Sequence, residues 1–139
     1  MTPIFADSCY WIALLNRKDQ LHLAAANARQ QIGQRSLVTT DEVLTEVLNF
    51  FSRRGALLRA LAVTAIEGIR LDDKVTVVEQ SRETFDRGLK LYKNRADKEF
   101  SLVDCVSFNA MTGGELIEAL TDDHHFEQAG FTALLRITK

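Results

Sequence analysis

Four acidic residues of the sequence stand where their carboxylates could act on one ligand. Asp7 directly follows a short apolar run, and Asp123 comes shortly after another. Glu46 and Asp104 fall inside segments whose composition is typical of helices. Carboxylates that share a crevice repel one another strongly unless a cation lies among them. All-oxygen ligands favour Mg²⁺ or Mn²⁺ over zinc, and such ions promote phosphodiester hydrolysis. The four acids therefore point to metal-assisted hydrolysis, provided that the fold brings them together.

Each acid also has a purely structural explanation, which the sequence leaves open. An aspartate that follows a strand, as Asp7 does, often forms a turn or begins a helix. Asp104 occupies the last position of Ser101-x-x-Asp104, which is a capping-box pattern, and Asp122-Asp123 could form a solvated turn. Taken singly, none of these acids identifies a site. Taken together, their order along the chain favours one.

The helix expected at residues 41–52 places Glu46 at the edge of its apolar face. At about 100° per residue, the apolar side chains of this segment cover one broad arc, and Glu46 falls just outside it. This phase fits a carboxylate that points into a cleft, and it also fits an ordinary flanking residue. Glu42 lies further round the helix, and we interpret it as the partner of Thr39 in a capping box, Thr39-x-x-Glu42.

Strands and helices alternate along the chain, which predicts an α/β fold with a parallel sheet. We expect strands at residues 4–6, 37–39, 75–78, 117–120 and 134–137. We expect helices at residues 11–15, 20–32, 41–52 and 56–69. A further helix begins at Ser81 and has an apolar stripe of Phe85, Leu89 and Tyr92. The last expected helix runs from Ser101 to Gly114. Parallel strands need crossover connections, which place helices on both faces. Ligands of such sheets bind beyond the carboxyl ends of the strands, where Asp7 and Asp123 stand.

Length and composition limit the classes of protein to which the chain can belong. Its 139 residues fit one domain, spanning 1–139, with 46% hydrophobic and 26% charged residues. Two cysteines are too few for a disulfide scaffold. No apolar run is long enough to cross a bilayer and no signal-peptide pattern is present at the N-terminus. We therefore expect a cytoplasmic protein that does not act at a membrane.

Four blocks of sequence resemble those of PIN-domain ribonucleases, and most of all the VapC-type toxins of toxin–antitoxin pairs. The resemblance covers nearly the whole chain. The blocks, in order, are Phe5-Ala6-Asp7-Ser8, the segment 40–47 around Glu46, the segment 97–108 around Asp104, and the segment 120–126 with Asp123-His124-His125-Phe126. Each block is a weak signal, but four in this order in a chain of this length are a strong one.

The resemblance implies a site, a fold and partners. Asp7, Glu46, Asp104 and Asp123 would be the acidic quartet, with Ser8 and Asp97 as accessory residues. Asp123 is chosen over Asp122 because it has the Asp-x-His-Phe spacing. The family also implies a five-stranded parallel sheet of order 3-2-1-4-5, endonucleolysis of RNA that depends on Mg²⁺ or Mn²⁺, homodimers, and an antitoxin protein that blocks the groove.

Basic residues are dense in one part of the chain, although the whole chain has a formal net charge of −2. This stretch has two interpretations. It could be a solvated helix face, because acidic residues are interspersed, or a flank that contacts RNA phosphates. The six basic residues are Arg82, Arg87, Lys90, Lys93, Arg95 and Lys98.

Three other functions remain as alternatives. The chain could be a PIN-like nuclease of RNA processing, or a PIN-like module that binds RNA or protein without catalysis. A phospho-receiver signalling domain is also a compact parallel α/β fold, but it usually has an acidic pair near its first strand, whereas Asp7 stands alone. A zinc site at His124 and His125 is not expected, because neighbouring side chains on a strand or helix point in different directions.

Overall fold

The sheet is built from five short strands that all run parallel. A computed structural model describes residues 1–136 of the chain. The strand order is β3-β2-β1-β4-β5, as expected. The strands are β1 (Ile4–Ala6), β2 (Leu37–Thr40), β3 (Val75–Val78), β4 (Glu118–Leu120) and β5 (Thr132–Ala133). β1 lies at the centre, with Phe5 paired to Val38 of β2 on one side and to Ala119 of β4 on the other.

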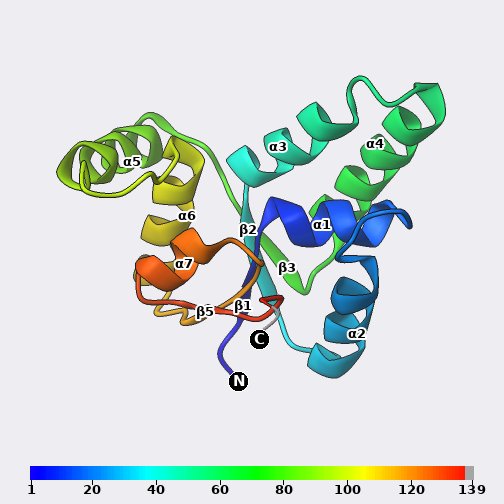
Figure 1. Ribbon diagram of the computed structural model, residues 1–139, viewed down its shortest axis with the longest axis horizontal. Coiled ribbons are helices and arrows are strands. Elements are labelled where there is room, and N and C mark those ends of the chain that lie inside the picture. Colours follow the sequence, from blue (N-terminus) through cyan, green and yellow to red (C-terminus); the bar gives the residue numbers. More distant parts are fainter. Residues whose placement is uncertain (137–139) are drawn as a thin grey trace.

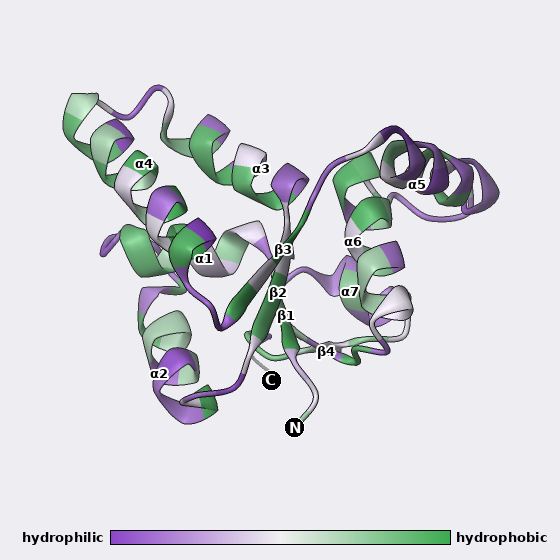
Figure 2. Cartoon of the chain, turned by 180° about the vertical axis from the view of Figure 1, so that it is seen from behind, coloured by the Kyte–Doolittle hydropathy of each residue, from purple (hydrophilic) through white to green (hydrophobic). Residues whose placement is uncertain are grey.

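Seven helices cover the two faces of the sheet within residues 1–136. On one side lie α1 (Ser8–Leu15), α2 (His22–Ile32), α3 (Asp41–Phe51) and α4 (Ala56–Leu71); on the other lie α5 (Arg82–Asn94), α6 (Leu102–Gly113) and α7 (His124–Gln128) (Figure 1). All three residues of β1 are fully buried between these layers, and Figure 2 shows the hydrophobic strands at the centre. No helix in this described part is long and apolar enough to span a bilayer.

The start of α3 differs from the prediction by one residue. Thr40, not Thr39, is the N-cap, and its hydroxyl accepts a hydrogen bond from the Val43 backbone N–H at 3.1 Å. Thr39 is fully buried and donates its hydroxyl to the Ala6 carbonyl at 2.9 Å, which ties β2 to β1. Among the described residues, Glu42 closes no capping box, and its Oε2 is buried without a hydrogen-bond partner. The predicted Thr39-x-x-Glu42 box is therefore wrong.

The expected apolar stripe of α5 is wrong at two of its three residues, since only Phe85 is half-buried. Leu89 and Tyr92 are 49% and 51% exposed, whereas Gly88 is buried against α6. A Cβ atom on Gly88 would lie only 2.7 Å from Cγ2 of Val106. The two helices approach so closely because Gly88 has no side chain, and this contact turns the Leu89 and Tyr92 side of α5 toward solvent.

The last strand begins earlier than expected. The predicted strand at residues 134–137 is replaced by β5 at Thr132–Ala133, and Ile137 lies outside the described residues. A short helix that the sequence pattern did not reveal, α7, and a left-handed turn at Gly130 (φ 97°) bring the chain back to the sheet sooner. The Leu134 N–H still donates to the Ala119 carbonyl at 2.9 Å, so this apolar segment continues along β4.

Candidate functional site

Asp7 is held at the carboxyl end of the central strand. It is the N-cap residue of α1 and only 6% of it is exposed. Its Oδ2 accepts a hydrogen bond from the Thr121 hydroxyl at 2.8 Å. Burial raises the pKa of Asp7 to about 7; hydrogen bonds from Thr121 and the Ser8 backbone oppose the shift, and the charges of Glu46 and Asp104 add to it. A buried carboxyl group with a pKa this high is characteristic of functional sites.

Thr121 connects two of the acids, and the sequence analysis missed it. It directly follows β4 and is fully buried. Besides donating to Asp7, its Oγ1 accepts a hydrogen bond from the Asp123 backbone N–H at 3.1 Å and lies 3.4 Å from Cys9 Sγ. The sequence signal for Thr121 was its position directly after β4, the strand that pairs with β1, which Asp7 follows.

His125 lies between the other two aspartates. Its Nδ1 is 3.1 Å from Oδ2 of Asp104 and 3.3 Å from Oδ1 of Asp123. The edge of the Phe100 ring packs against the imidazole, with the ring centroids 5.7 Å apart. Asp104 also forms the expected capping box with Ser101, accepting a hydrogen bond from the Ser101 backbone N–H at 3.1 Å. The structural and functional interpretations of Asp104 are thus compatible, because the capping box fixes the carboxylate that faces His125.

Glu46 completes the group from α3. It is partly buried, and burial raises its pKa; a hydrogen bond from Ser8 opposes this shift, while the charges of Asp104 and Asp123 add to it. Burial likewise raises the pKa of Asp104, with a further contribution from Asp123. These mutual effects mean that the four carboxylates share one electrostatic environment. The fold therefore brings together all four acids singled out in the sequence, with Ser8 beside them.

Asp97 stands apart from the other four acids. Its carboxylate accepts two hydrogen bonds from the Arg95 guanidinium, at 3.0 and 3.2 Å. This pair holds the pKa of Asp97 below its usual value. Asp97 nevertheless shares a surface hollow of about 150 Å³ with Lys98 and His125. It lies at the edge of the acidic group, where a role in the site remains a prediction.

The group of four acids fits a hard divalent cation by its chemistry. Its donors are carboxylate oxygens, the ligands that Mg²⁺ and Mn²⁺ prefer. Burial, together with the charges of neighbouring acids, raises the pKa values of Asp7, Glu46 and Asp104. A bound cation would offset the mutual repulsion of the carboxylates and favour their ionised form.

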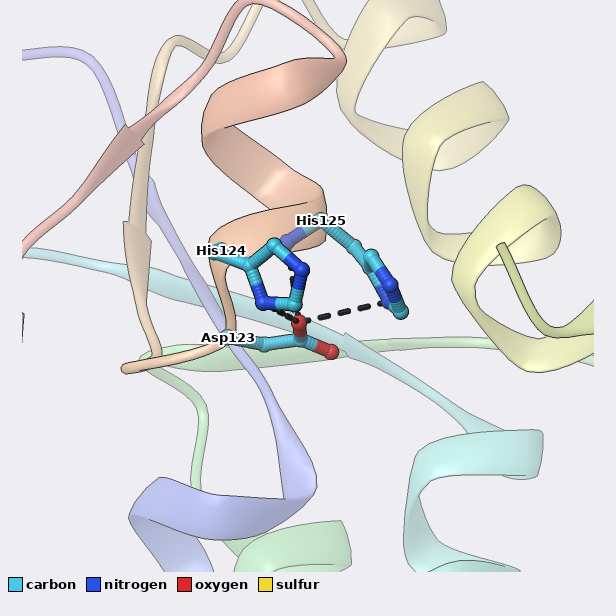
Figure 3. A group of neighbouring side chains, drawn as sticks. All are labelled: Asp123, His124 and His125. Carbon is cyan, nitrogen blue, oxygen red and sulfur yellow. Dashed lines mark hydrogen bonds and ion pairs between the residues drawn. The ribbon is translucent and has the colours of Figure 1, made fainter. Parts of the chain in front are cut away.

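The two neighbouring histidines do not diverge as expected. Nδ1 of His124 and Nδ1 of His125 lie 3.7 and 3.3 Å from the same oxygen, Oδ1 of Asp123, and the ring centroids are 4.4 Å apart (Figure 3). The first turn of α7 causes this convergence, because the Asp123 carboxylate folds back to accept the His125 backbone N–H at 2.9 Å. The prediction that their side chains point apart is therefore wrong.

The predicted basic residues divide into two groups. Arg82, Arg87, Lys90 and Lys93 lie on the exposed side of α5, which Figure 2 shows as a largely hydrophilic helix at the outer edge of its layer. Arg95 and Lys98 lie in the loop that leads to α6.

A cavity of about 570 Å³ lies away from the acids, between α1, α2 and α4. Its walls include Trp11, Ile32 and Ile69, with Arg29 at its side. It contains none of the residues that the sequence singled out. We take the acids as the candidate site because their carboxylates converge and the pKa values of Asp7, Glu46 and Asp104 are raised, whereas the charged residues that line the cavity include Arg29 and Lys74 and form no such group.

Comparisons with known proteins agree with this geometry. Residues 4–132 match the PIN domain family. The chain is 29% identical over 128 residues to the 23S rRNA-specific endonuclease VapC20 of Mycobacterium tuberculosis, in both strain CDC 1551 and strain H37Rv, and the match covers 92% of this chain and 95% of the relative. The crystal structure of M. tuberculosis VapC20, described as a sarcin–ricin loop cleaving toxin, superposes with a TM-score of 0.81 at 28% identity, covering 93% of this chain and 96% of that one.

Proposed function

Because this chain belongs to the PIN-domain family, we propose that it is a metal-dependent endoribonuclease, the toxin of a toxin–antitoxin pair that acts in the cytoplasm. The observation that supports this most directly is the group of four acids around the buried Asp7, at the carboxyl edge of the sheet. Membership of the PIN-domain family excludes the alternative that the chain is a phospho-receiver domain.

We assign the metal to Asp7, Glu46, Asp104 and Asp123, with Mg²⁺ or Mn²⁺ as the ion. When bound, such an ion supplies an activated water and stabilises charge on the leaving oxygen. Other residues of the chain position these carboxylates. Thr121 orients Asp7 through the 2.8 Å hydrogen bond, and His125 contacts both Asp104 and Asp123. Ser8 steadies Glu46. In this proposal water attacks the phosphodiester directly, and no covalent protein intermediate is needed.

The six basic residues would bring RNA to these acids. The exposed side of α5 carries Arg82, Arg87, Lys90 and Lys93, which can track phosphates. Arg95 and Lys98 stand nearer, and Lys98 shares the hollow of His125 and Asp97. We propose that α5 holds the flanking strand while the scissile phosphate lies at the acids.

The test is cleavage of RNA by the metal-stripped protein after Mg²⁺ or Mn²⁺ is added back. The name of the relative VapC20 makes 23S rRNA, including its sarcin–ricin loop, the first substrate to try. We expect metal-dependent cleavage that Asp7→Asn abolishes and that Glu67→Gln, a change of an exposed acid on α4, leaves intact. Cleavage that persists in Asp7→Asn would refute the site. Wild-type protein that binds RNA but never cleaves it would indicate a binding module.

Partners follow from the same proposal. We expect a homodimer and a cognate antitoxin that covers the acids. Sedimentation of the isolated protein would test the dimer. Co-expression with the reading frame next to its gene, followed by a cleavage assay, would test the antitoxin.

A further inference from the structure

Three donor atoms converge at the start of α7 in a way that the proposed nuclease site does not need. Oδ1 of Asp123, Nδ1 of His124 and Nδ1 of His125 all lie within 4.8 Å of one another (Figure 3). The His124 imidazole contacts Asp123 but none of the other three acids in the described hydrogen bonds and ion pairs. The convergence therefore calls for a separate explanation.

The spacing of these atoms is close to that of a zinc site. Zinc binds histidine nitrogen at about 2.0–2.1 Å in tetrahedral geometry, so neighbouring donors around it are about 3.3–3.4 Å apart. The distance from Oδ1 of Asp123 is 3.3 Å to Nδ1 of His125 and 3.7 Å to Nδ1 of His124. The two histidine nitrogens lie within 4.8 Å of one another, and the His124 side chain, which is exposed, has to move closer for tetrahedral coordination.

The surroundings give an ion a way in and a place for a fourth ligand. His124 and His125 line a hollow of about 150 Å³ that opens to solvent, and Asp97 and Glu99 line it from the other side. The His124 side chain is 56% exposed, whereas that of His125 is only 18% exposed and is braced by Phe100. Because the hollow opens to solvent, a water molecule can complete the tetrahedron.

We propose that Asp123, His124 and His125 bind one Zn²⁺ ion, at a site that shares Asp123 with the proposed Mg²⁺ or Mn²⁺ site. Imidazole nitrogen favours zinc strongly over magnesium, so the two sites select different metals. Zinc would engage Asp123 and the His125 nitrogen that now faces Asp104. Under the proposed nuclease function, zinc bound here inhibits cleavage by removing Asp123 from the hard-metal site.

Binding is tested without RNA, so that the test does not depend on nuclease activity. The protein is prepared without a histidine tag and stripped of metal, and Co²⁺ is titrated as a spectroscopic substitute for zinc. We expect one equivalent to bind with the intense visible absorption of tetrahedral cobalt, and Zn²⁺ to displace it. His124→Ala should weaken zinc binding by at least about tenfold, measured by competition with a chromophoric chelator.

Two further variants locate the ion. Gln128→Ala, an exposed neighbour on α7, and Asp7→Asn, which disables the four-acid site, should both retain zinc affinity. Loss of binding in Asp7→Asn with retention in His124→Ala would place the ion among the acids and overturn the proposal. Absence of a tetrahedral cobalt spectrum in the wild type would overturn it as well.

Inhibition is then measured on the protein that cleaves RNA. For each variant, the zinc concentration that halves its own Mn²⁺-supported rate is determined. We expect His124→Ala to need at least about tenfold more zinc than wild type, and Gln128→Ala to match wild type. Equal sensitivity of all three would refute the inhibitory link while leaving the binding result to stand. A wild type that binds zinc but never cleaves RNA would refute the proposed function alone.

Discussion

At the scale of single residues, the chemistry depends on how Asp7 is buried. A carboxyl group that is 6% exposed, with its pKa raised to about 7, is protonated in about half of the molecules at neutral pH. The unfolded chain gives up that proton near pH 4. The folded, metal-free protein is therefore under electrostatic strain at neutral pH, and a bound cation would relieve it.

This strain predicts that the metal-free protein is less stable at pH 8 than at pH 5. Because the folded pKa of Asp7 lies above the unfolded one, its contribution to stability is complete below about pH 4 and is lost as the pH rises to about 7. The loss between pH 5 and pH 8 is roughly 2–3 kcal/mol from Asp7, and Glu46 and Asp104 act in the same direction. Urea denaturation at the two pH values measures it.

Asp7→Asn is the matched variant, because a neutral amide removes this titration. We expect its pH dependence to be much smaller than that of the wild type, and Asp72→Asn, a change of an exposed acid, to behave like the wild type. Adding Mn²⁺ at pH 8 should raise the stability of wild type far more than that of Asp7→Asn. A pH slope unchanged by Asp7→Asn would contradict the raised pKa.

Thr121 supplies a second residue-scale prediction. Thr121→Val removes the donor to Asp7 and the acceptor of the Asp123 N–H, which leaves buried polar groups without partners. We expect a loss of stability of about 1–3 kcal/mol and slower RNA cleavage at temperatures where the variant is still folded. Thr121→Ser should restore both, because it keeps the hydroxyl, and Thr112→Val, on the exposed side of α6, should affect neither. Failure of the serine variant would show that the hydroxyl is not the cause.

At the scale of elements, sequence reasoning succeeded where local patterns decide. Ser81 and Ser101 begin α5 and α6 as predicted, since a capping box is complete within four residues. It failed where tertiary contacts decide. Thr39 and Thr40 are indistinguishable in sequence, yet only the strand pairing with β1 shows which of them is buried and which caps α3. The exposed Leu89 and Tyr92 follow from Gly88, whose importance depends on Val106 of another helix.

In the candidate site, too, local patterns could be predicted from the sequence and tertiary contacts could not. The four acids could be found because their residue types and order are enough to indicate a family. Thr121 and the convergence of His124 and His125 could not, because both depend on side-chain directions set by the turn between β4 and α7.

The contact between α5 and α6 can be tested by filling the space at Gly88. Gly88→Ala would place a methyl group 2.7 Å from Cγ2 of Val106, and a valine side chain has little freedom to move away. We expect a loss of about 1–3 kcal/mol, although alanine is the better helix former. Gly68→Ala, in open space on α4, should instead stabilise by about 0.5–1 kcal/mol. Thermal denaturation compares them.

A double variant makes this test specific. Val106→Ala removes the clashing methyl groups, so the combination Gly88→Ala with Val106→Ala should cost less than the sum of the two single changes. Strict additivity would mean that the two residues do not meet as the structure places them.

At the scale of the whole molecule, charge is distributed unevenly despite the net charge of −2. The four site acids lie at the carboxyl edge of the sheet, while α5 exposes Arg82, Arg87, Lys90 and Lys93 beside only two acids, Glu83 and Asp86. Such a separation suits a polyanion that must be held beside a negatively charged pocket, because the basic surface attracts the strand that the acids alone would repel.

This separation predicts how RNA affinity depends on salt. Replacing Arg87, Lys90 and Lys93 by glutamine should weaken binding to unrelated RNA sequences to a similar extent. The slope of log affinity against log salt should fall by about 0.7 for each phosphate that the protein no longer neutralises. Arg59→Gln and Arg70→Gln, on α4 across the sheet, should leave the slope unchanged. Fluorescence anisotropy at several salt concentrations decides between binding of RNA by α5 and a merely solvated surface.

The central position of β1 has a consequence for when the acidic site can form during synthesis. Asp7 is synthesised before Leu120 and Thr121, yet its backbone N–H bonds the Leu120 carbonyl at 3.2 Å and its carboxylate is oriented by Thr121. A nascent chain that has not yet reached these residues has β1 as an open edge, with the first acid separated from the last. If RNA is the substrate, cleavage therefore has to wait until residues 120–123 have been synthesised and have packed beside β1.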